Sequence, residues 1–296
     1  MELRDIEYFG VVAQHGNMRR AAEALGLTPP ALSKSLRRLE TSMEAKLVER
    51  TGRGVRLTPF GAALAAQSVR LRLTLADITR EASDLNKGRA GHLRIGAGPT
   101  DCELLPAACM RLMKEAPKVT LDITVTDNDA LIPLMRDGTL DLSFNNIPAM
   151  PYEGIEQLHI FEDQYVAFAS AQHPLTGRRK LGLSDLAGES WTTSTANFRP
   201  KQLLLQVFAE HGLPEPRFAM QTRSVRLRLQ FIAGSRLLGF GPKRTVDIAA
   251  KSFRLKTLPV KELTLPRPVG VMYRKGAYLS PAGRRLIELF RASAAS

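Results

Sequence analysis

The sequence predicts an α/β protein in three parts: a small helical head ending in a β-hairpin, one long helix, and a larger domain with two lobes of alternating strands and helices. Three observations predict this order. Apolar residues recur at helical spacing through the first 42 residues, one helical pattern runs from Thr58 to Lys87, and short apolar runs alternate with helical ones beyond Gly91. A chain of 296 residues is long enough for two or three domains, each with its own core.

The N-terminus, the cysteines and the histidines argue against several classes of protein. The first seven residues, MELRDIE, are charged, and no apolar run reaches the ~20 residues that span a bilayer. We therefore expect a cytoplasmic protein with no membrane partner. Cys102 and Cys109 stand seven positions apart in one expected helix, so we expect free thiols. The five histidines show no metal-ligand spacing, and we expect neither a metal nor a cofactor.

The basic charge of the chain lies mainly in its last third. The net charge is +13 and the pI is about 10.1. Residues 217–296 hold 17 lysines and arginines and three acidic residues, which leaves the first 216 residues with a net charge of −1. DNA binding by the N-terminus must therefore be argued from local pattern. The basic third favours an acidic effector or an acidic partner surface, unless it is simply a solvated surface.

Two short helices and a tight turn are expected first. Residues 5–14 bury one apolar face, and residues 19–25 form a second helix that Gly26 ends, since glycine suits a left-handed C-cap. Thr28 can cap the next helix with its hydroxyl, and Pro29 suits the first helical position. The pattern indicates two helices joined by a tight turn.

The third helix, residues 29–42, has an apolar face of leucines and an outward face that is cationic and hydrogen-bonding. The outward residues are Ser33, Lys34, Arg37 and Arg38. In a major groove, Arg and Lys reach guanine acceptors or phosphates, and a serine hydroxyl can bond to either. A basic helix face is often just solvated, but here it follows a short helix and a glycine turn, which favours a helix-turn-helix.

A β-hairpin with a glycine-rich tip is expected next. Residues 47–50 and 55–57 would form its strands. This hairpin would be the wing of a winged helix-turn-helix. Arg50, Arg53 and Arg56 could contact phosphates beside the groove, which adds affinity with little sequence information.

The most specific motif is AAEALGLTPPALSKSLRRLE at residues 21–40, continued by LVER at 47–50 and LTPFG at 57–61. These runs resemble the LysR-type transcriptional regulators, and the resemblance covers nearly the whole chain. The resemblance and the outward pattern place DNA contacts at Thr28, Pro30, Ala31, Ser33, Lys34, Arg37, Arg38, Arg50, Arg53 and Arg56. The family more often has Gln at Pro29, a small or hydroxyl residue at Met18 and Phe at Val48, so the chain departs from it at single positions.

One helix about 43 Å long is expected from Thr58 to Lys87. Its apolar seam alternates spacings of three and four, the period of a coiled coil, and comprises Gly61, Leu64, Ser68, Leu71, Leu75, Ile78, Ala82 and Leu85. This favours a dimer that pairs two DNA-binding heads, although such a helix could also pack on its own domain. We expect a DNA-binding domain at residues 1–58 and a linker at 59–90, with a hinge at Gly88–Gly91.

Repeated βα units predict an effector domain over residues 91–296 with a mainly parallel sheet. Lobe I is expected at 91–161 and 267–296, and lobe II at 162–266. The family resemblance matches here through Leu93–Gly96, Gly138–Leu142, His173–Leu175 and Ala233–Gly234. It implies two Rossmann-like lobes, similar to periplasmic solute-binding proteins, with a small effector held between them.

Ligands of open α/β sheets bind beyond the carboxyl ends of strands, near helix N-termini. The residues expected at that place are Pro99, Thr100, Asp101, Asn128, Asn145, Asn146, Thr193, Ser194, Arg236 and Phe240. Thr100 with Glu103 also matches a capping box, and Asn128 and Ser194 are equally suited to capping. The effector is a small organic acid if Arg236 and the basic third face the cleft; if they coat the outer surface, the cleft is neutral.

The sequence thus predicts a sequence-specific DNA-binding transcriptional regulator controlled by a small-molecule effector. An enzyme is not expected, because there is no nucleophile elbow and no glycine-rich phosphate loop. A free solute-binding protein would give no role to the first 87 residues, and a regulator whose larger domain only oligomerises is a third alternative. The expected partners are double-stranded DNA, the effector, further copies of the chain in a dimer or tetramer, and RNA polymerase.

Overall fold

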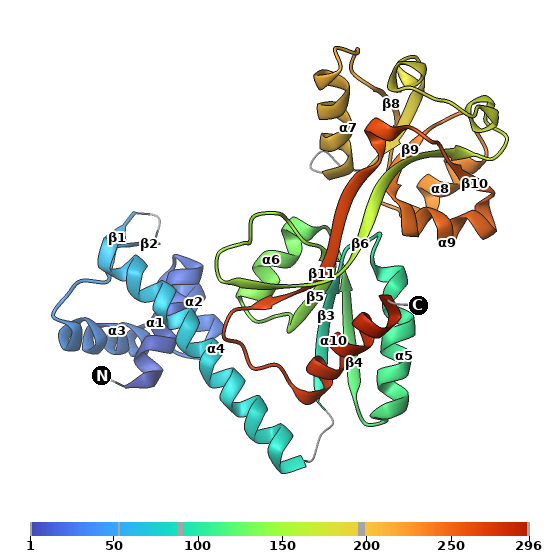
Figure 1. Cartoon of the computed structure of the whole chain (residues 1–296). Coiled ribbons are helices and arrows are strands. Elements are labelled where there is room, and N and C mark those ends of the chain that lie inside the picture. The colour runs from blue at the N-terminus through green and yellow to red at the C-terminus, as the bar shows by residue number, and fades with distance from the viewer. Residues whose placement is uncertain (1, 53, 88–90, 195–198, 295–296) are drawn as a thin grey trace. The chain divides into compact units, whose positions relative to one another are not determined.

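The computed structural model describes residues 2–52, 54–87, 91–194 and 199–294, and it divides into two compact units, Met1–Asn86 and Lys87–Ser296 (Figure 1). Each unit is described by itself. The expected hinge residues 88–90 lie outside the described residues. The elements of the first unit are α1 (Leu3–His15), α2 (Met18–Ala24), α3 (Pro29–Met43), β1 (Val48–Thr51), β2 (Gly54–Leu57) and α4 (Pro59–Lys87).

The helix-turn-helix forms as predicted, because each helix start has its own cap. The side chain of Asn17 accepts hydrogen bonds from two backbone N–H groups in the first turn of α2. Gly26 follows α2 with a φ of 64°, the left-handed region in which a side chain would be strained. Thr28 then caps α3 by accepting a hydrogen bond from the N–H of Ala31. Local chemistry therefore fixes the turn between α2 and α3.

Two small apolar clusters hold α1, α2, α3 and the hairpin together, and we call this part of the first unit the head. The fully buried members of the clusters are Phe9, Val12, Ala21, Ala22, Leu32, Leu39 and Leu47. Strands β1 and β2 pair antiparallel. The N–H of Val55 donates to the carbonyl of Gly16, which ties the hairpin to the end of α1.

The first half of α4 packs within the head. A β-carbon at Gly61 would lie 2.0 Å from the carbonyl oxygen of Leu47, and one at Gly10 would lie 3.0 Å from the hydroxyl of Ser68. Leu64 packs on the apolar cluster around Phe9. The expected intermolecular seam included Gly61, Leu64 and Ser68. In the structure these three residues pack against the head of the same chain.

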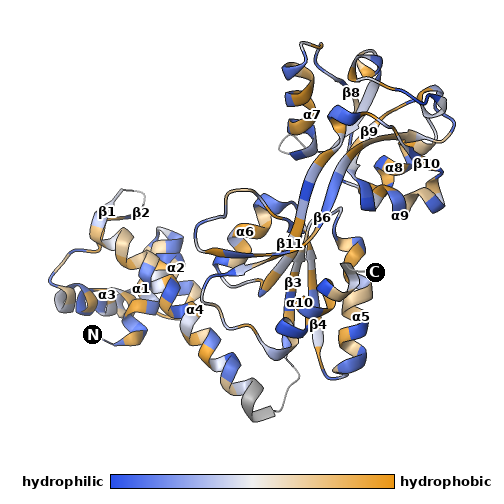
Figure 2. Ribbon diagram, in the orientation of Figure 1, coloured by the Kyte–Doolittle hydropathy of each residue, from blue (hydrophilic) through white to orange (hydrophobic). Residues whose placement is uncertain are grey.

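The second half of α4 keeps apolar residues accessible. Leu71 and Leu75 are half-buried, and Ile78 is 56% exposed. Figure 2 shows hydrophobic and hydrophilic patches along α4. A seam that pairs two copies would therefore begin near Leu71 rather than at Gly61.

The second unit is a mixed sheet flanked by helices. Its strands are β3 (His92–Ala97), β4 (Thr120–Val125), β5 (Leu142–Asn146), β6 (Ile155–Ser170), β7 (Ser190–Thr193), β8 (Arg217–Gln221), β9 (Gly239–Pro242), β10 (Leu255–Thr257) and β11 (Leu265–Arg274). Its α-helices are α5 (Leu105–Glu115), α6 (Asn128–Arg136), α7 (Arg199–Glu210), α8 (Val225–Ala233), α9 (Lys243–Phe253) and α10 (Pro281–Ala294).

The strand order of the main sheet is β10-β6-β11-β5-β3-β4, with β9 also paired to β6. Strands β3, β4 and β5 run parallel, but β11 is antiparallel to β5 and to β6, and β6 is antiparallel to β9 and β10. In this sheet the expected parallel arrangement holds only for β3, β4 and β5, while β7 and β8 pair parallel in a separate two-stranded sheet. The reason is connectivity, since β6 carries the chain from one lobe to the other and β11 carries it back.

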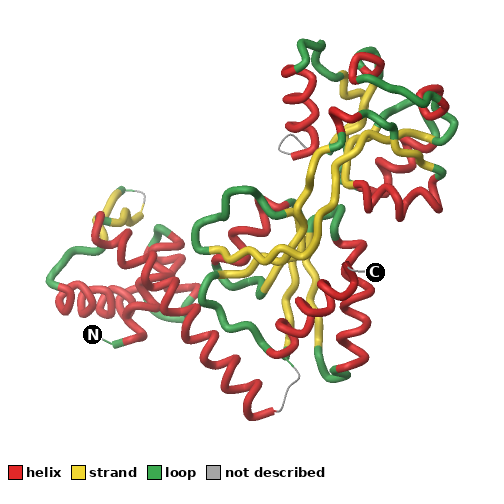
Figure 3. The backbone as a smooth tube through the Cα atoms, viewed as in Figure 1, coloured by secondary structure: helices red, strands yellow, loops and turns green. Residues whose placement is uncertain are grey.

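Strands β6 and β11 connect two lobes with separate cores, as Figures 1 and 3 show. In lobe I, α5 and α10 cover one face of the sheet and α6 covers the other. Phe144 stacks on Phe290 there, with ring centroids 4.3 Å apart. Lobe II is built around Trp191, which is fully buried. Along β6 the first core reaches Phe161 and the second begins at Tyr165.

Several local features differ from the sequence prediction. Helix α9 was not predicted, and β6, with 16 residues, crosses the expected boundary between the lobes at residues 161 and 162. Cys102 lies in a short 3-10 helix that precedes α5, and Cys109 lies in α5, so they do not share one helix; both are free thiols. That 3-10 helix follows Asp101 without a side-chain cap, so the expected capping box of Thr100 and Glu103 does not form. No helix among the described residues is long and apolar enough to cross a membrane.

Candidate DNA-binding face and effector cavity

The outward face of α3 is open to solvent in the first unit. Thr28, Pro30, Ala31, Lys34 and Arg37 are exposed, and Ser33 is half-buried. In the described part of the chain, neither Lys34 nor Arg37 forms an ion pair through its side chain. Two such cations beside a hydroxyl can reach the phosphates and base edges of a DNA groove.

Arg38 has a different environment, because its guanidinium holds a buried carboxylate. Its Nε donates to Oδ2 of Asp5 at 2.8 Å, and its Nη2 donates to Oδ1 of the same carboxylate. The hydroxyl of Ser35 donates to that Oδ1 at 2.6 Å. Hydrogen bonds from Arg38 lower the pKa of Asp5 to about 2, although burial opposes the shift. Arg38 was predicted as a DNA contact, and in this structure it joins α3 to α1.

A second buried carboxylate joins α3 to the hairpin. Glu40 accepts a hydrogen bond from the N–H of Leu47 at 2.9 Å and another from Nζ of Lys46 at 2.9 Å. Burial raises the pKa of Glu40, but these hydrogen bonds outweigh burial and the pKa is lowered overall. Glu40 therefore stays charged and fixes the entry of the chain into β1.

Among the three predicted wing arginines, Arg56 pairs with an acidic residue of the hairpin. Arg56 is exposed and pairs with Glu49 across the hairpin at 2.6 Å. Arg50 lies in β1 in register with Val55. Arg53 lies outside the described residues.

The second unit contains a cavity of about 750 Å³ between its lobes. This size is suited to a small molecule, since ligand sites usually measure about 300–1,000 Å³. Lobe I lines it with Gly98, Pro99, Thr100, Asp101, Asp127, Asn128, Asp129, Ala130, Asn146, Pro148 and Tyr152. The connecting strands and lobe II line it with Tyr165, Arg199, Pro200, Gln202, Arg223 and Arg267.

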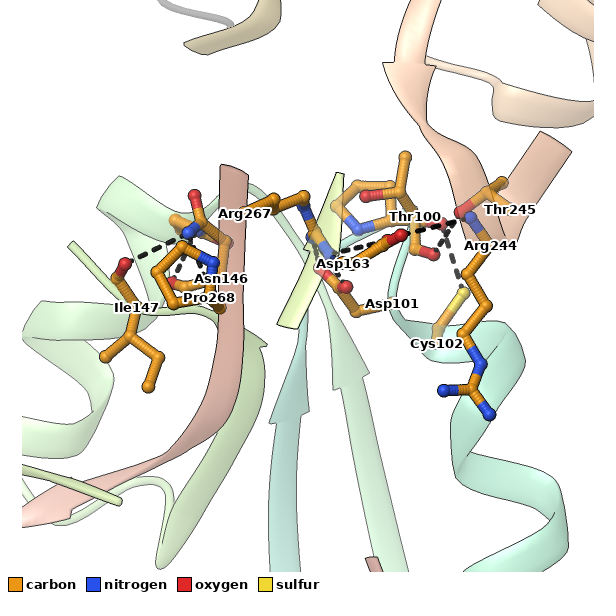
Figure 4. Close-up of polar contacts among 12 residues, drawn as sticks. Thr100, Asp101, Cys102, Asn146, Ile147, Asp163, Arg244, Thr245, Arg267 and Pro268 are labelled. Carbon is orange, nitrogen blue, oxygen red and sulfur yellow. Dashed lines mark hydrogen bonds and ion pairs between the residues drawn. The ribbon is translucent and has the colours of Figure 1, made fainter. Parts of the chain in front are cut away.

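A buried cluster of charges around Arg267 borders the cavity (Figure 4). Nη2 of Arg267, in β11, donates to both carboxylate oxygens of Asp101 at 2.6 and 2.7 Å, and Nη1 lies 3.5 Å from Oδ2 of Asp163 in β6. The side chains of Arg267 and Asp101 are each 3% exposed. Burial lowers the pKa of Arg267, but the neighbouring charge of Asp101 outweighs it and raises the pKa overall. The cluster thus fixes lobe I to the connecting strands.

The start of α9 links lobe II to lobe I close to this cluster. The hydroxyl of Thr245 donates to the carbonyl of Thr100 at 2.9 Å, and the N–H of Arg244 donates to Oδ1 of Asp163 at 3.3 Å (Figure 4). The guanidinium of Arg244 lies over the ring of Phe161, 4.8 Å from its centroid. These bonds hold the start of α9 against lobe I and β6 beside the cavity.

Five of the ten residues predicted to bind the effector line the cavity: Pro99, Thr100, Asp101, Asn128 and Asn146. Asn128 is the first residue of α6, and Asp127 precedes it as the N-cap, so Asn128 does not cap the helix. Its Nδ2 donates to the carbonyl of Asn146 at 3.5 Å.

The other five predicted residues do not line it. Asn145 is fully buried in β5, where alternation turns it to the opposite face from Asn146. Thr193 and Ser194 are buried at the end of β7, and Ser194 starts no helix, since α7 begins at Arg199.

Phe240 packs on the Tyr165 ring in the core of lobe II, 5.8 Å between centroids. Arg236 is exposed in the loop between α8 and β9. That loop is tied to His173, whose Nε2 donates to the carbonyl of Arg236 at 3.2 Å, so the side chain is not among those at the cavity.

The lining residues that sequence reasoning missed include Asp129 of lobe I and, beyond it, Tyr152, Tyr165, Arg199, Gln202, Arg223 and Arg267. The excess of basic residues after position 217 was a signal for two of these arginines. Nothing in their local pattern distinguished Arg223 and Arg267 from the other basic residues of that segment. Among the described residues, no three metal-ligating side chains gather at one place.

A winged helix-turn-helix with an exposed basic helix, joined to a two-lobed domain with a cavity of ligand size, defines a DNA-binding regulator with an effector domain. The chain belongs to the LysR family. Residues 86–295 match the LysR substrate binding domain, and residues 3–62 match the bacterial regulatory helix-turn-helix protein, lysR family. It is a transcriptional regulator and not an enzyme.

Individual relatives match along the whole chain. The RuBisCO operon transcriptional regulator of Allochromatium vinosum is 27% identical over 295 residues, which covers 100% of this chain and 97% of that protein. The regulator YtlI of Bacillus subtilis (strain 168) is 30% identical over 273 residues, covering 92% and 87%. Full-length CbnR complexed with its target DNA shares the fold, with a TM-score of 0.62 at 22% identity and 99% and 100% of the chains covered.

Proposed function

We propose that this regulator binds a specific operator through α3 and the β1–β2 wing, and that a small organic acid in the cavity between the lobes controls the binding. Two copies would join through the second half of α4 and present two heads to two half-sites. A regulator of this kind acts at the chromosome, so we place it in the cytoplasm with double-stranded DNA and RNA polymerase as partners.

The proposal of an acidic effector rests on the positive charge of two arginines at the cavity. Arg199 and Arg223 line it, and neither guanidinium has an ion-pair partner among the described residues. Hydrogen bonds from a guanidinium to a carboxylate are roughly twice as strong as neutral ones, and they are commonly bidentate. A carboxylate ligand would therefore neutralise charge that the protein itself leaves unpaired.

The DNA part depends on the contrast between Arg37 and Arg38. Arg37 is exposed and has no ion-pair partner among the residues that the structure describes, whereas Arg38 holds the buried Asp5. We expect Arg37→Ala to weaken operator binding by about 1–3 kcal/mol and to leave the melting temperature unchanged. Arg38→Ala should lower the melting temperature as well.

The measurement is footprinting of genomic DNA to find the operator, then fluorescence anisotropy with operator and scrambled duplexes. Arg56→Ala in the wing is the matched control and should weaken both duplexes by a similar factor, because a phosphate contact is insensitive to sequence. An Arg37→Ala variant with an unchanged ratio of operator to scrambled affinity would show that α3 does not read the operator.

A further inference from the structure

Two arginines of lobe II line the cavity at the N-terminal ends of helices, where a positive charge does not stabilise a helix. Arg199 is the first residue of α7, and Arg223 lies one residue before Ser224, the N-cap of α8. The first turns of both helices lack acidic residues. A helix N-terminus already carries a partial positive charge, so an arginine there is unfavourable for the helix itself. An anion would offset both the guanidinium groups and the helix ends.

Lobe I presents the opposite charge to the same cavity. Asp127 is the N-cap of α6, yet its side chain makes no capping hydrogen bond, and Asp129 lies in the first turn. Neither carboxylate has an ion pair or a side-chain hydrogen bond in the described part of the chain. Tyr152 lies near both kinds of charge, since burial and Asp129 raise its pKa while Arg199 lowers it.

The third arginine at the cavity does not add to its positive charge. Arg267 is held by Asp101 at 2.6 and 2.7 Å and lies 3.5 Å from Asp163, so two carboxylates face one guanidinium. The guanidinium of Arg267 is therefore already bound by carboxylates of the protein. This leaves Arg199 and Arg223 as the groups that can hold an acid.

A buried polar atom of one lining residue also lacks a partner. Nε of Arg267 has no hydrogen-bond acceptor among the described residues. Unsatisfied buried groups are costly and rare in native proteins. This one favours a ligand that carries polar atoms.

We propose that the effector is a zwitterion, a small amino acid whose carboxylate is bound by Arg199 and Arg223 of lobe II and whose ammonium group is bound by Asp127 and Asp129 of lobe I. This rests on the proposed function and narrows it from organic acids in general to those that also carry a cationic nitrogen. A ligand with both charges contacts both lobes, so its binding favours one angle between them.

The test is a thermal-shift and calorimetric screen of the full-length chain with the twenty α-amino acids, each beside its deaminated acid and its decarboxylated amine. We expect one or a few amino acids to bind, and both truncated forms to bind about tenfold more weakly or worse. The double variant Asp127→Asn/Asp129→Asn should bind an amino acid and its deaminated acid alike. The double variant Arg199→Gln/Arg223→Gln should bind neither the amino acid nor its deaminated acid.

Asp122→Asn and Arg236→Gln are matched controls, since both residues are exposed and neither lines the cavity. They should bind the amino acid like the unmodified chain, and a wild-type melting temperature without ligand shows that each variant folds. If deaminated acids bind as tightly as amino acids and the binding needs Arg199 and Arg223, the proposal of an amino-acid effector is wrong and the proposal of an organic acid stands. If none of the acids binds, both are wrong.

Discussion

In the head, each of the two buried carboxylates has several partners, whereas four charged side chains at the cavity of the second unit have no ion-pair partner among the described residues. Asp5 accepts hydrogen bonds from Ser35 and Arg38, and Glu40 accepts them from Leu47 and Lys46. The four side chains at the cavity are Asp127, Asp129, Arg199 and Arg223. The charges buried in the head are paired within it, and those at the cavity are available to a ligand.

Outside the head, the second half of α4 keeps apolar surface accessible within the first unit, where Ile78 is 56% exposed. We expect the double substitution Leu71→Glu/Leu75→Glu to weaken self-association by about 3–6 kcal/mol, because each leucine buried in a seam contributes about 1.5–3 kcal/mol. Sedimentation should show a shift toward monomer. Thr74→Glu, on the same helix outside the seam, is the control; an unaltered dimer in the double variant would rule out this seam.

Asp101 binds the buried Arg267 beside the cavity through both carboxylate oxygens. Its substitution tests whether this buried ion pair stabilises the second unit, as the buried carboxylates stabilise the head. Asp101→Ala leaves Arg267 buried with Asp163 as its remaining carboxylate, and we expect the free energy of unfolding to fall by about 3–5 kcal/mol. Urea unfolding followed by the fluorescence of Trp191, the single tryptophan, measures it. Asp129→Ala should change stability by less than about 0.5 kcal/mol. Equal effects of the two substitutions would contradict the assignment.

Asp5 gives the head a specific dependence on acid. Its pKa falls from the usual 3.8 to about 2 on folding, so it stabilises the folded state above pH 4, and this contribution is lost as the pH falls toward 2. We expect it to amount to about 2 kcal/mol at neutral pH.

Hydrogen exchange of α1 and α3 amides at pH 7 and pH 3 should show the difference between wild type and Asp5→Asn shrink with acid. Glu7→Gln, an exposed change on α1, is the control. A difference that stays constant between the two pH values would mean that Asp5 is not ionised in the folded head.

The sequence determined the head and the linker closely, because the signals there are local. A cap at Thr28, a glycine at Gly26 and leucines at helical spacing depend on neighbours within a few residues, and the observed helices begin and end within two residues of the expected ones. The sequence did not show that Arg38 binds Asp5. The two residues are 33 positions apart, and only the packing of α3 on α1 brings them together.

At the cavity, the sequence by itself determined which loops of lobe I line it, and the tertiary structure decided nearly everything else. Loops after parallel strands meet at one edge of a sheet, so Pro99, Thr100 and Asn128 could be placed from the strand pattern. Arg199, Arg223 and Arg267 reach the same cavity because β6 and β11 carry the chain into lobe II and back. That connection joins residues more than a hundred positions apart, and no local pattern records it.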